Sequence, residues 1–268
     1  MGVGGRAHVV SLVNQKGGVG KTTTAQHLGY ALADFHRKNV LLIDSDPQGN
    51  LTYTMGVDPD KLENTLFDVL KGDTSLSSII KPYDKLENGS LDIAPSNIQL
   101  SRAEIELVRE INATFLLKTA LTDPLMIGEG SYDYVIIDCP PSLGILTINA
   151  LAASSHVLVP VQPEMYALQG LDALRGTIDT VRLRANPGLE VLGWLVTLHD
   201  GRTRIHKDVT ALFRQRFGKQ ICDTVISMNT TLREAQANRK TIWQFDSSRT
   251  GAKNYEMLAD EVVSRVEG

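Results

Sequence analysis

Hydrophobic residues follow two alternating patterns along the chain. Short runs rich in valine, leucine and isoleucine are typical of strands buried on both faces, and the segments between them carry apolar residues at helical spacing. This alternation predicts an α/β fold with a mostly parallel, twisted sheet and helices on both faces. We expect strands at 8–13, 39–43, 91–94, 134–137, 156–161, 190–198 and 220–226, and helices at 22–37, 98–111, 145–153, 168–185, 205–217 and 252–266.

No segment has the composition of a linker between domains. No proline-, serine- or glycine-rich stretch and no internal repeat interrupts the pattern, so we expect a single domain spanning residues 1–268. The stretch 57–97 is the least regular, because Gly72, Pro82 and the pair Asn88-Gly89 break it. We expect this stretch to form an insertion at the rim of the fold.

A glycine-rich string joins the first expected strand to the first expected helix: Lys16-Gly17-Gly18-Val19-Gly20-Lys21-Thr22-Thr23. This context is typical of the phosphate-binding loop of the P-loop NTPase fold. Glycines let backbone N–H groups turn towards phosphate oxygens, and the helix amino terminus adds partial positive charge. We expect Lys21 to bind the β- and γ-phosphates of ATP and Thr22 to hold Mg²⁺. The string therefore predicts binding of ATP and magnesium.

Lys16 gives this loop a second lysine at its start, which the general pattern of the loop does not require. Two lysines beside one another repel unless a phosphate lies between them. We therefore expect Lys16 to act on a nucleotide phosphate.

Three aspartates follow expected strands at the side of the sheet where the loop lies. Asp44 and Asp46 end the strand at 39–43, and Asp138 ends the strand at 134–137. Ligands of open α/β sheets lie beyond the carboxyl ends of strands, so these acids converge on the phosphate loop. We expect Asp44 to contact magnesium through water, Asp46 to orient the attacking water, and Asp138 to serve as an outer magnesium ligand of the Walker B type. The combination predicts a slow ATP hydrolase.

Composition excludes several other classes of protein. The two cysteines, Cys139 and Cys222, have no ligand-type spacing, which argues against disulfides, zinc and an iron–sulfur centre within the chain. No apolar stretch approaches the roughly 20 residues that span a bilayer, and the first residues lack an apolar signal segment, so we expect a cytoplasmic protein.

The same motifs resemble those of the ParA/Soj-type partition ATPases, which have a deviant Walker A loop. The resemblance is carried, in order, by NQKGGVGKTTTA, VLLIDSDPQGN, YDYVIIDCPPSLG, VPVQPEMYALQG and LVTLHDGRT. It implies a homodimer that sandwiches ATP, in which Lys16 reaches the γ-phosphate bound by the other subunit. It also implies ATP-dependent binding to double-stranded DNA of any sequence, association with the nucleoid, and hydrolysis stimulated by a ParB-type partner. The cargo would be a plasmid or a chromosome.

The chain departs from this family in its last third. Where the family reads approximately IPRNVRLSEAPSFGKPI, this chain has VISMNTTLREAQANRKTI at 225–242. Thr231 stands at the position of the family's DNA-contacting arginine, Arg233 lies two places further on, and Asn229 keeps its place near the expected adenine pocket. The first strand begins near residue 8, so we expect no DNA-reading helix-turn-helix extension before it.

One region of this acidic protein is basic. The formal net charge is −4, but residues 199–254 carry +6 and the rest −10. A basic surface duplicated in a dimer can hold a DNA backbone by avidity, and the scarcity of aromatic residues there favours duplex over single strands. The string LVTLHDGRTR places two arginines on a loop after a strand. The expected DNA contacts are Arg202, Arg204, Lys207, Arg233, Arg239 and Lys240.

Three alternative functions remain open. A membrane regulator of the MinD type needs a basic amphipathic terminal helix, but the acidic residues Glu256, Asp260, Glu261 and Glu267 of the last segment disfavour an anionic membrane. An amide ligase or iron–sulfur reductase could use the same loop, although suitable cysteines and an acceptor motif are missing. The same ATPase cycle could also position a protein compartment or cluster.

Overall fold

The expected sheet is present, with its strands ordered so that the loop after the first strand lies near the middle. The computed structural model describes residues 7–83, 86–122, 132–165 and 167–268. These residues form an 8-stranded sheet in the order β3-β4-β2-β5-β1-β6-β7-β8, parallel except for the β3–β4 pair. The strands are β1 (His8–Leu12), β2 (Asn39–Asp44), β3 (Lys81–Pro82), β4 (Ser90–Ala94), β5 (Tyr134–Asp138), β6 (His156–Val161), β7 (Glu190–His199) and β8 (Ile221–Ser227).

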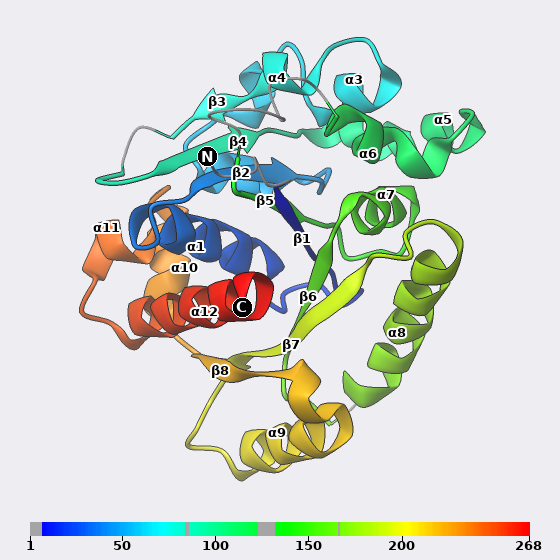
Figure 1. Cartoon of the computed structure of the whole chain (residues 1–268). Helices are drawn as coiled ribbons and strands as arrows, with labels where there is room; N and C mark the ends of the chain where they lie inside the picture. Colours follow the sequence, from blue (N-terminus) through cyan, green and yellow to red (C-terminus); the bar gives the residue numbers. More distant parts are fainter. Residues whose placement is uncertain (1–6, 84–85, 123–131, 166) are drawn as a thin grey trace.

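Helices connect these strands and cover both faces of the sheet (Figure 1). The α-helices are α1 (Lys21–Asp34), α2 (Asn50–Thr54), α3 (Leu66–Lys71), α4 (Leu76–Ile79), α5 (Ala103–Glu106), α6 (Leu116–Ala120), α7 (Ile145–Ala153), α8 (Ala167–Arg184), α9 (Arg204–Phe217), α10 (Thr230–Ala237), α11 (Ile242–Asp246) and α12 (Thr250–Glu267). Short 3₁₀ turns are η1 (Pro59–Lys61), η2 (Ile98–Arg102), η3 (Leu107–Arg109), η4 (Ala113–Phe115) and η6 (Gly218–Gln220).

Successive residues of the central strands pack into two separate cores. In β2, Leu41 and Ile43 belong to the core under α3, α7 and α8, whereas Val40 and Leu42 belong to the core under α1 and α12. Figure 1 shows α1, α10, α11 and α12 together on the second face. This burial on both sides explains why the strands read as continuous apolar runs. The prediction of an α/β fold with a mostly parallel sheet and helices on both faces is confirmed.

The prediction of one continuous helix at 98–111 is wrong. This segment is a chain of single turns, η2, α5 and η3, and the backbone leaves helical geometry at Glu110. Leu100, Ala103 and Leu107 are buried at helical spacing, which is the signal that suggested one helix. The side chain of Asn97 instead accepts a hydrogen bond from Gln99 N and starts a 3₁₀ turn, so the segment turns more tightly than an α-helix.

The insertion at 57–97 is more ordered than its breakers indicated, and it does lie at one edge of the sheet. It contains η1, α3, α4, β3 and β4. Thr65 and Asp68 form a reciprocal capping box at the start of α3, in which Thr65 N donates to the Asp68 carboxylate over 2.8 Å. This local cap stabilises a helix too short for its periodicity to stand out.

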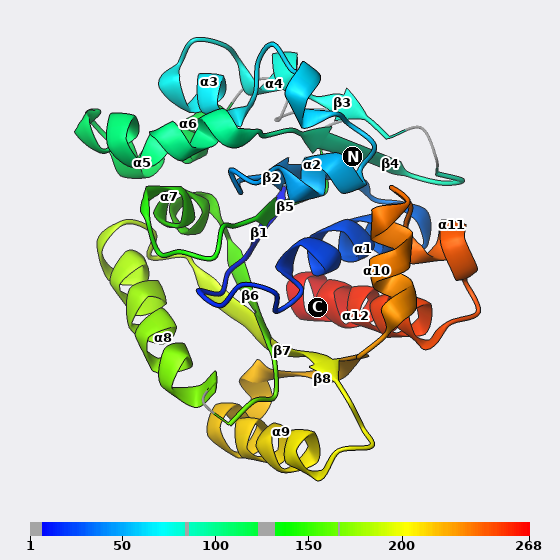
Figure 2. The same cartoon turned by 180° about the vertical axis from the view of Figure 1, so that it is seen from behind.

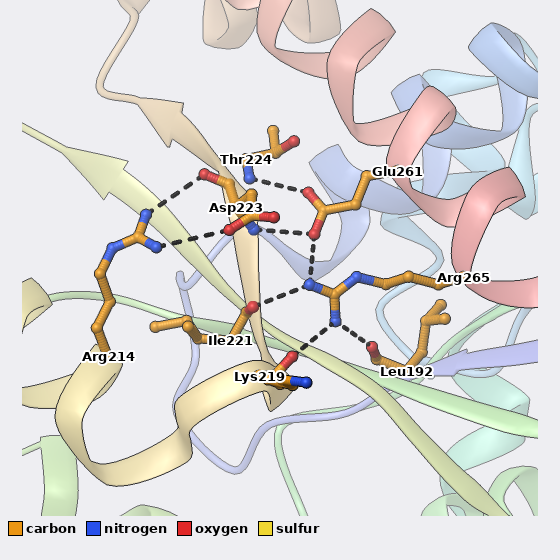
Figure 3. Close-up of polar contacts among 8 residues, drawn as sticks. All are labelled: Leu192, Arg214, Lys219, Ile221, Asp223, Thr224, Glu261 and Arg265. Carbon is orange, nitrogen blue, oxygen red and sulfur yellow. Dashed lines mark hydrogen bonds and ion pairs between the residues drawn. The ribbon is translucent and has the colours of Figure 1, made fainter.

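The other edge of the sheet is closed by α12 (Figure 3). The Glu261 carboxylate accepts hydrogen bonds from Asp223 N and Thr224 N of β8, each over 2.8 Å. Arg265, one turn further along α12, donates to Ile221 O over 2.9 Å and pairs with Glu261 over 2.7 Å. Side chains of one helix therefore take the place of a neighbouring strand and hold α12 on the sheet.

Candidate functional site

The loop between β1 and α1 has the conformation that a phosphate-binding loop requires. Gly18 and Gly20 have φ angles of 74° and 87°, in the left-handed region that favours glycine. Gly20 is the N-cap residue of α1, which starts at Lys21. Val19 is buried, and its carbonyl accepts a hydrogen bond from Thr197 Oγ1 of β7 over 2.7 Å. The loop is therefore held in shape from behind, with the amino terminus of α1 left open.

The Lys21 side chain lies across the loop. Its Nζ donates to Asn14 O over 3.0 Å and to Lys16 O over 3.3 Å. Burial lowers the pKa of this ammonium, while the nearby Asp138 and Asp46 carboxylates act in the opposite direction. A buried cation held by two carbonyls is well suited to bind an anion that arrives in the loop.

Asp138 is a buried acid without a partner. It lies opposite Asp44 in the β2–β5 register. Both of its carboxylate oxygens are buried, and neither has a hydrogen-bond partner within the described parts of the chain. Burial and the charge of Asp44 raise the pKa of Asp138 well above its usual range, while the nearby Thr22 hydroxyl and the Lys21 ammonium act in the opposite direction. Buried acids are normally satisfied, so an orphaned carboxylate beside a phosphate loop indicates a missing cation or water.

Asp44 differs from Asp138 because its oxygens are hydrogen-bonded. Thr52 donates to Asp44 Oδ2 through its backbone N over 2.8 Å and through its hydroxyl over 2.7 Å, and Asp46 N donates to Oδ1 over 3.1 Å. Burial nevertheless raises the pKa of Asp44 to about 6. These bonds tie β2 to α2 and fix the backbone that carries Asp46.

The donor set fits magnesium bound together with a nucleotide. Within the described ranges, no group of three or more His, Cys, Asp or Glu residues could hold a metal ion alone. Mg²⁺ in nucleotide sites takes most of its ligands from phosphates and water, with one or two protein groups. The Thr22 hydroxyl and the orphaned Asp138 carboxylate can supply these groups.

A cavity of about 700 Å³ opens in front of the loop. Asp46 lines it, anchored because Gln48 N donates to its Oδ1 over 3.0 Å. Of the residues predicted from sequence, nine line this cavity: Gly17, Gly18, Gly20, Lys21, Thr22, Thr23, Asp46, Asn229 and Arg233. Sequence reasoning missed Tyr53 of α2, Gln236 of α10 and Tyr255 of α12, which also line it. In the sequence, Tyr255 falls at helical spacing with Leu258, Val262 and Val266, a pattern that indicates packing on a core and not a binding site.

Lys16 points away from this cavity. Its Nζ lies 2.5 Å from Glu164 Oε2 and 3.3 Å from Gln162 Oε1, just beyond β6. Lys16 and Val19 line a separate, smaller cavity of about 270 Å³ together with Gln162 and Leu171. The two lysines of the loop thus face different sides of it.

The expected DNA contacts divide into two groups. Arg202, Arg204 and Lys207 are exposed on the β7–α9 loop and the start of α9. Arg202 donates to both carboxylate oxygens of Asp200, over 2.9 and 2.8 Å, and these bonds hold the pKa of Asp200 well below its usual range.

The second group lies on or after α10. Arg233 lines the nucleotide cavity, and the Arg239 guanidinium lies 4.1 Å from the ring centre of Tyr53. Lys240 follows and is exposed. The start of α10 lies beside the end of β7, where Met228 N donates to His199 O over 3.0 Å, whereas Arg239 and Lys240 follow the other end of α10. Figure 2 shows α10 beside α1 and α2.

None of the helices in the described ranges is long and apolar enough to cross a membrane.

Comparison with known proteins identifies relatives over nearly the whole chain. A family model described as an AAA domain matches residues 7–191. The sporulation initiation inhibitor protein Soj of Bacillus subtilis is 44% identical over 256 residues, covering 96% of this chain and 98% of Soj. The chromosome partitioning protein ParA of Caulobacter vibrioides is 42% identical over 257 residues, covering 96% of this chain and 94% of that protein.

A solved structure gives the same picture of the fold. Cobyrinic acid a,c-diamide synthase from Mycobacterium smegmatis, with bound ADP and magnesium, superposes with a TM-score of 0.84 at 36% identity. The superposition covers 98% of this chain and 96% of that one. It is also solved with an ATP analogue and magnesium.

Proposed function

Because the chain belongs to the ParA/Soj family of partition ATPases, we propose that it hydrolyses ATP slowly as a switch for DNA segregation. On this proposal ATP and Mg²⁺ are its cofactors, and the ATP-bound form is a homodimer on the nucleoid. The dimer binds duplex DNA of any sequence, and a ParB-type partner stimulates hydrolysis. The cargo is a plasmid or chromosome.

The observation that carries the ATPase part is the convergence of Lys21, Asp46 and the orphaned Asp138 on one phosphate loop. Backbone N–H groups of residues 17–21 bind phosphate oxygens, and Lys21 neutralises the β- and γ-phosphates. Thr22 would hold magnesium, with Asp138 as an outer ligand and Asp44 contributing through water while it fixes the β2–α2 backbone. Magnesium supplies charge neutralisation on the phosphates.

Asp46 orients the attacking water in front of the γ-phosphate. The water oxygen forms the new bond to phosphorus as the bond to the β–γ bridging oxygen breaks, and the products are ADP and phosphate. Asn229 lines the same cavity, and on this proposal it contacts the adenine. Lys16 lines a separate cavity and pairs with the half-exposed Glu164, so on this proposal its ammonium exchanges that partner for the nucleotide of a second subunit.

The DNA part rests on the exposed basic group at the β7–α9 loop and on its doubling in a dimer. Fluorescence anisotropy on unrelated duplexes tests it with ATP, with ADP and without nucleotide. We expect binding that requires ATP, ignores sequence and falls steeply with salt. Binding that is equal in all three nucleotide states, or absent in all, contradicts the proposal.

An amide ligase is a second candidate, favoured by the likeness to the solved structure named as a diamide synthase. A ligase consumes ATP only with an acid acceptor and an amine donor, because the phosphoryl group activates the acid. Phosphate release by the purified protein with ATP and magnesium alone, increased by DNA or by a partner, distinguishes the two functions. The same ATPase cycle could also move a protein compartment or cluster. The identity of the partner that stimulates hydrolysis distinguishes this cargo from a plasmid or chromosome.

A further inference from the structure

Helix α10 forms one wall of the nucleotide cavity, and its attachment to the opposite wall depends on polar side chains. Leu232, Arg233, Gln236 and Ala237 of α10 face the cavity across from the loop and the first turn of α1. Thr231, Leu232 and Ala235 anchor one side of α10 in the protein, whereas Arg233 and Ala237 on the cavity side are exposed and Gln236 is half-buried. The position of this wall therefore depends strongly on the hydrogen bonds that it makes.

A chain of hydrogen bonds joins α10 to the phosphate end of α1. Thr23 Oγ1 donates to Gln236 Oε1 over 3.0 Å, and Gln236 Nε2 donates to Gln26 Oε1 over 3.3 Å. Gln26 Nε2 in turn donates to Thr54 O of α2 over 3.2 Å. Gln236 is thus hydrogen-bonded to two successive turns of α1, the helix whose amino terminus forms part of the phosphate site.

A second connection starts from the same threonine. The Thr23 carbonyl accepts a hydrogen bond from His27 Nδ1 over 2.8 Å, and His27 Nε2 accepts one from Ile242 N, at the start of α11, over 3.1 Å. Thr23 therefore contacts the segment 230–242 through both its side chain and its backbone. Because Thr23 follows the Lys21-Thr22 pair, a bound triphosphate acts directly on this junction.

The segment connected in this way carries basic side chains. Arg233 lies on α10 itself, Arg239 packs on Tyr53 of α2, and Lys240 follows. Gln236 lies in the stretch where the chain departs from the pattern of its family.

We propose that Gln236 is a positioning residue that transmits the state of the nucleotide site, through Thr23, to the basic segment 230–242. ATP binding orders α10 against α1, and α10 then presents Arg239 and Lys240. The step to DNA affinity rests on the proposed function, whereas the ordering of α10 does not.

Hydrogen–deuterium exchange tests the ordering without DNA, in the wild type and in Gln236→Leu. In the wild type, ATP with magnesium should slow exchange in both 17–24 and 230–242. In Gln236→Leu the slowing at 17–24 should persist, while that at 230–242 should fall by about five- to tenfold, the effect of losing one or two hydrogen bonds. Gln99→Leu, at an exposed glutamine outside the cavity, is the matched control and should resemble the wild type.

Thermal unfolding and ATP calorimetry on Gln236→Leu establish that the variant is folded and loaded. Anisotropy on duplex DNA then gives the second readout, where we expect a similar loss of ATP-stimulated affinity. If the wild type binds no DNA, the proposed function is contradicted, but the exchange experiment still decides whether Gln236 orders α10. The inference is overturned if ATP slows exchange at 230–242 as much in Gln236→Leu as in the wild type. It is also overturned if ATP does not slow exchange there in the wild type.

Discussion

Lys16 and Glu164 form an ion pair at 2.5 Å on the side of the loop opposite the nucleotide cavity, although 148 residues separate them. Both side chains are 45% exposed, so the pair opens easily. An approaching γ-phosphate competes with Glu164 for the same ammonium. Assembly of the dimer on our proposal therefore replaces one partner of Lys16 with another.

Lys16→Gln tests this exchange of partners. The variant should bind ATP almost normally as a monomer but neither dimerise nor hydrolyse, because the lost charge acts on the other subunit's nucleotide. Sedimentation with ATP measures the dimer. Glu164→Gln is the complementary change, and it should dimerise at about two- to fivefold lower ATP concentration, since only an exposed pair is lost. Normal hydrolysis by monomeric Lys16→Gln contradicts the sandwich.

Lys21→Ala should weaken ATP binding by roughly a hundredfold or more, because it removes a buried cation from the β- and γ-phosphates. Calorimetry with ATP and magnesium measures the loss. Thermal unfolding checks that the variant is folded, because the ammonium also donates to Asn14 O and Lys16 O. Unchanged affinity for ATP refutes the assignment of the loop.

Asp46→Ala should bind ATP and form a long-lived dimer with turnover reduced by roughly 10²–10⁴-fold, because the group that orients water is lost while the phosphate cradle remains. Phosphate release and the rate of dimer dissociation measure the two effects. A variant dimer that dissociates in ATP as fast as the wild type shows that Asp46 has another role.

Arg202→Glu combined with Arg204→Glu should abolish DNA binding and spare ATP-dependent dimerisation. Both side chains are exposed and lie outside the nucleotide cavity. The matched control is the double variant Arg175→Glu and Arg184→Glu on α8, which reverses the same amount of exposed charge. It should bind DNA far more tightly than the Arg202 and Arg204 variant. Anisotropy at several salt concentrations measures both. Equal affinity for the wild type and the Arg202 and Arg204 variant removes DNA from this surface.

His27→Gln addresses the dependence of stability on pH. Burial lowers the pKa of His27 to about 4 from an ordinary value of 6.5. Between these values the unfolded chain holds a proton that the folded chain does not, so the free energy of unfolding decreases as pH falls through this window. The full effect is about 3 kcal/mol, present above pH 6.5 and lost towards pH 4.

Glutamine at position 27 keeps an acceptor for Ile242 N but does not titrate. Urea unfolding of both proteins from pH 4 to pH 7 should therefore give a flatter profile for the variant. Titration of the carboxylates changes the free energy of unfolding of both proteins in the same way. The difference between the two pH profiles therefore reports on His27 alone. Parallel profiles show that this histidine is not held neutral by the fold.

Sequence patterns predicted those parts of the fold that depend on residues close together in the chain. The β1 loop, α1 and the acids after β2 and β5 follow from glycine positions, apolar runs and strand ends, all read within about 15 residues. Helix α10 was missed because few of its residues are large and apolar, and α11 because five residues are too few to show a helical period. Both are held by hydrogen bonds to α1, more than 200 residues earlier. No short window contains that information.

The same reasoning applies to the candidate site. Asp44, Asp46 and Asp138 were all expected to act on magnesium or water, yet the structure separates a hydrogen-bonded Asp44 from an orphaned Asp138. The difference comes from Thr52, whose distance from the Asp44 carboxylate depends on how α2 folds back. Sequence spacing gives the acids their place at the strand ends but not their hydrogen-bond partners.

The closed edges of the sheet limit how copies of this protein can assemble. Beside β8, Asn254, Glu261 and Arg265 of α12 occupy backbone groups that another strand would otherwise bind. At the opposite edge β3 is two residues long, and its Pro82 has no N–H to donate. We therefore expect that copies of the folded protein do not associate by adding strand to strand, even where the proposed DNA binding would bring many of them together. Contacts between copies, including those of the proposed ATP dimer, would instead be made by side-chain surfaces.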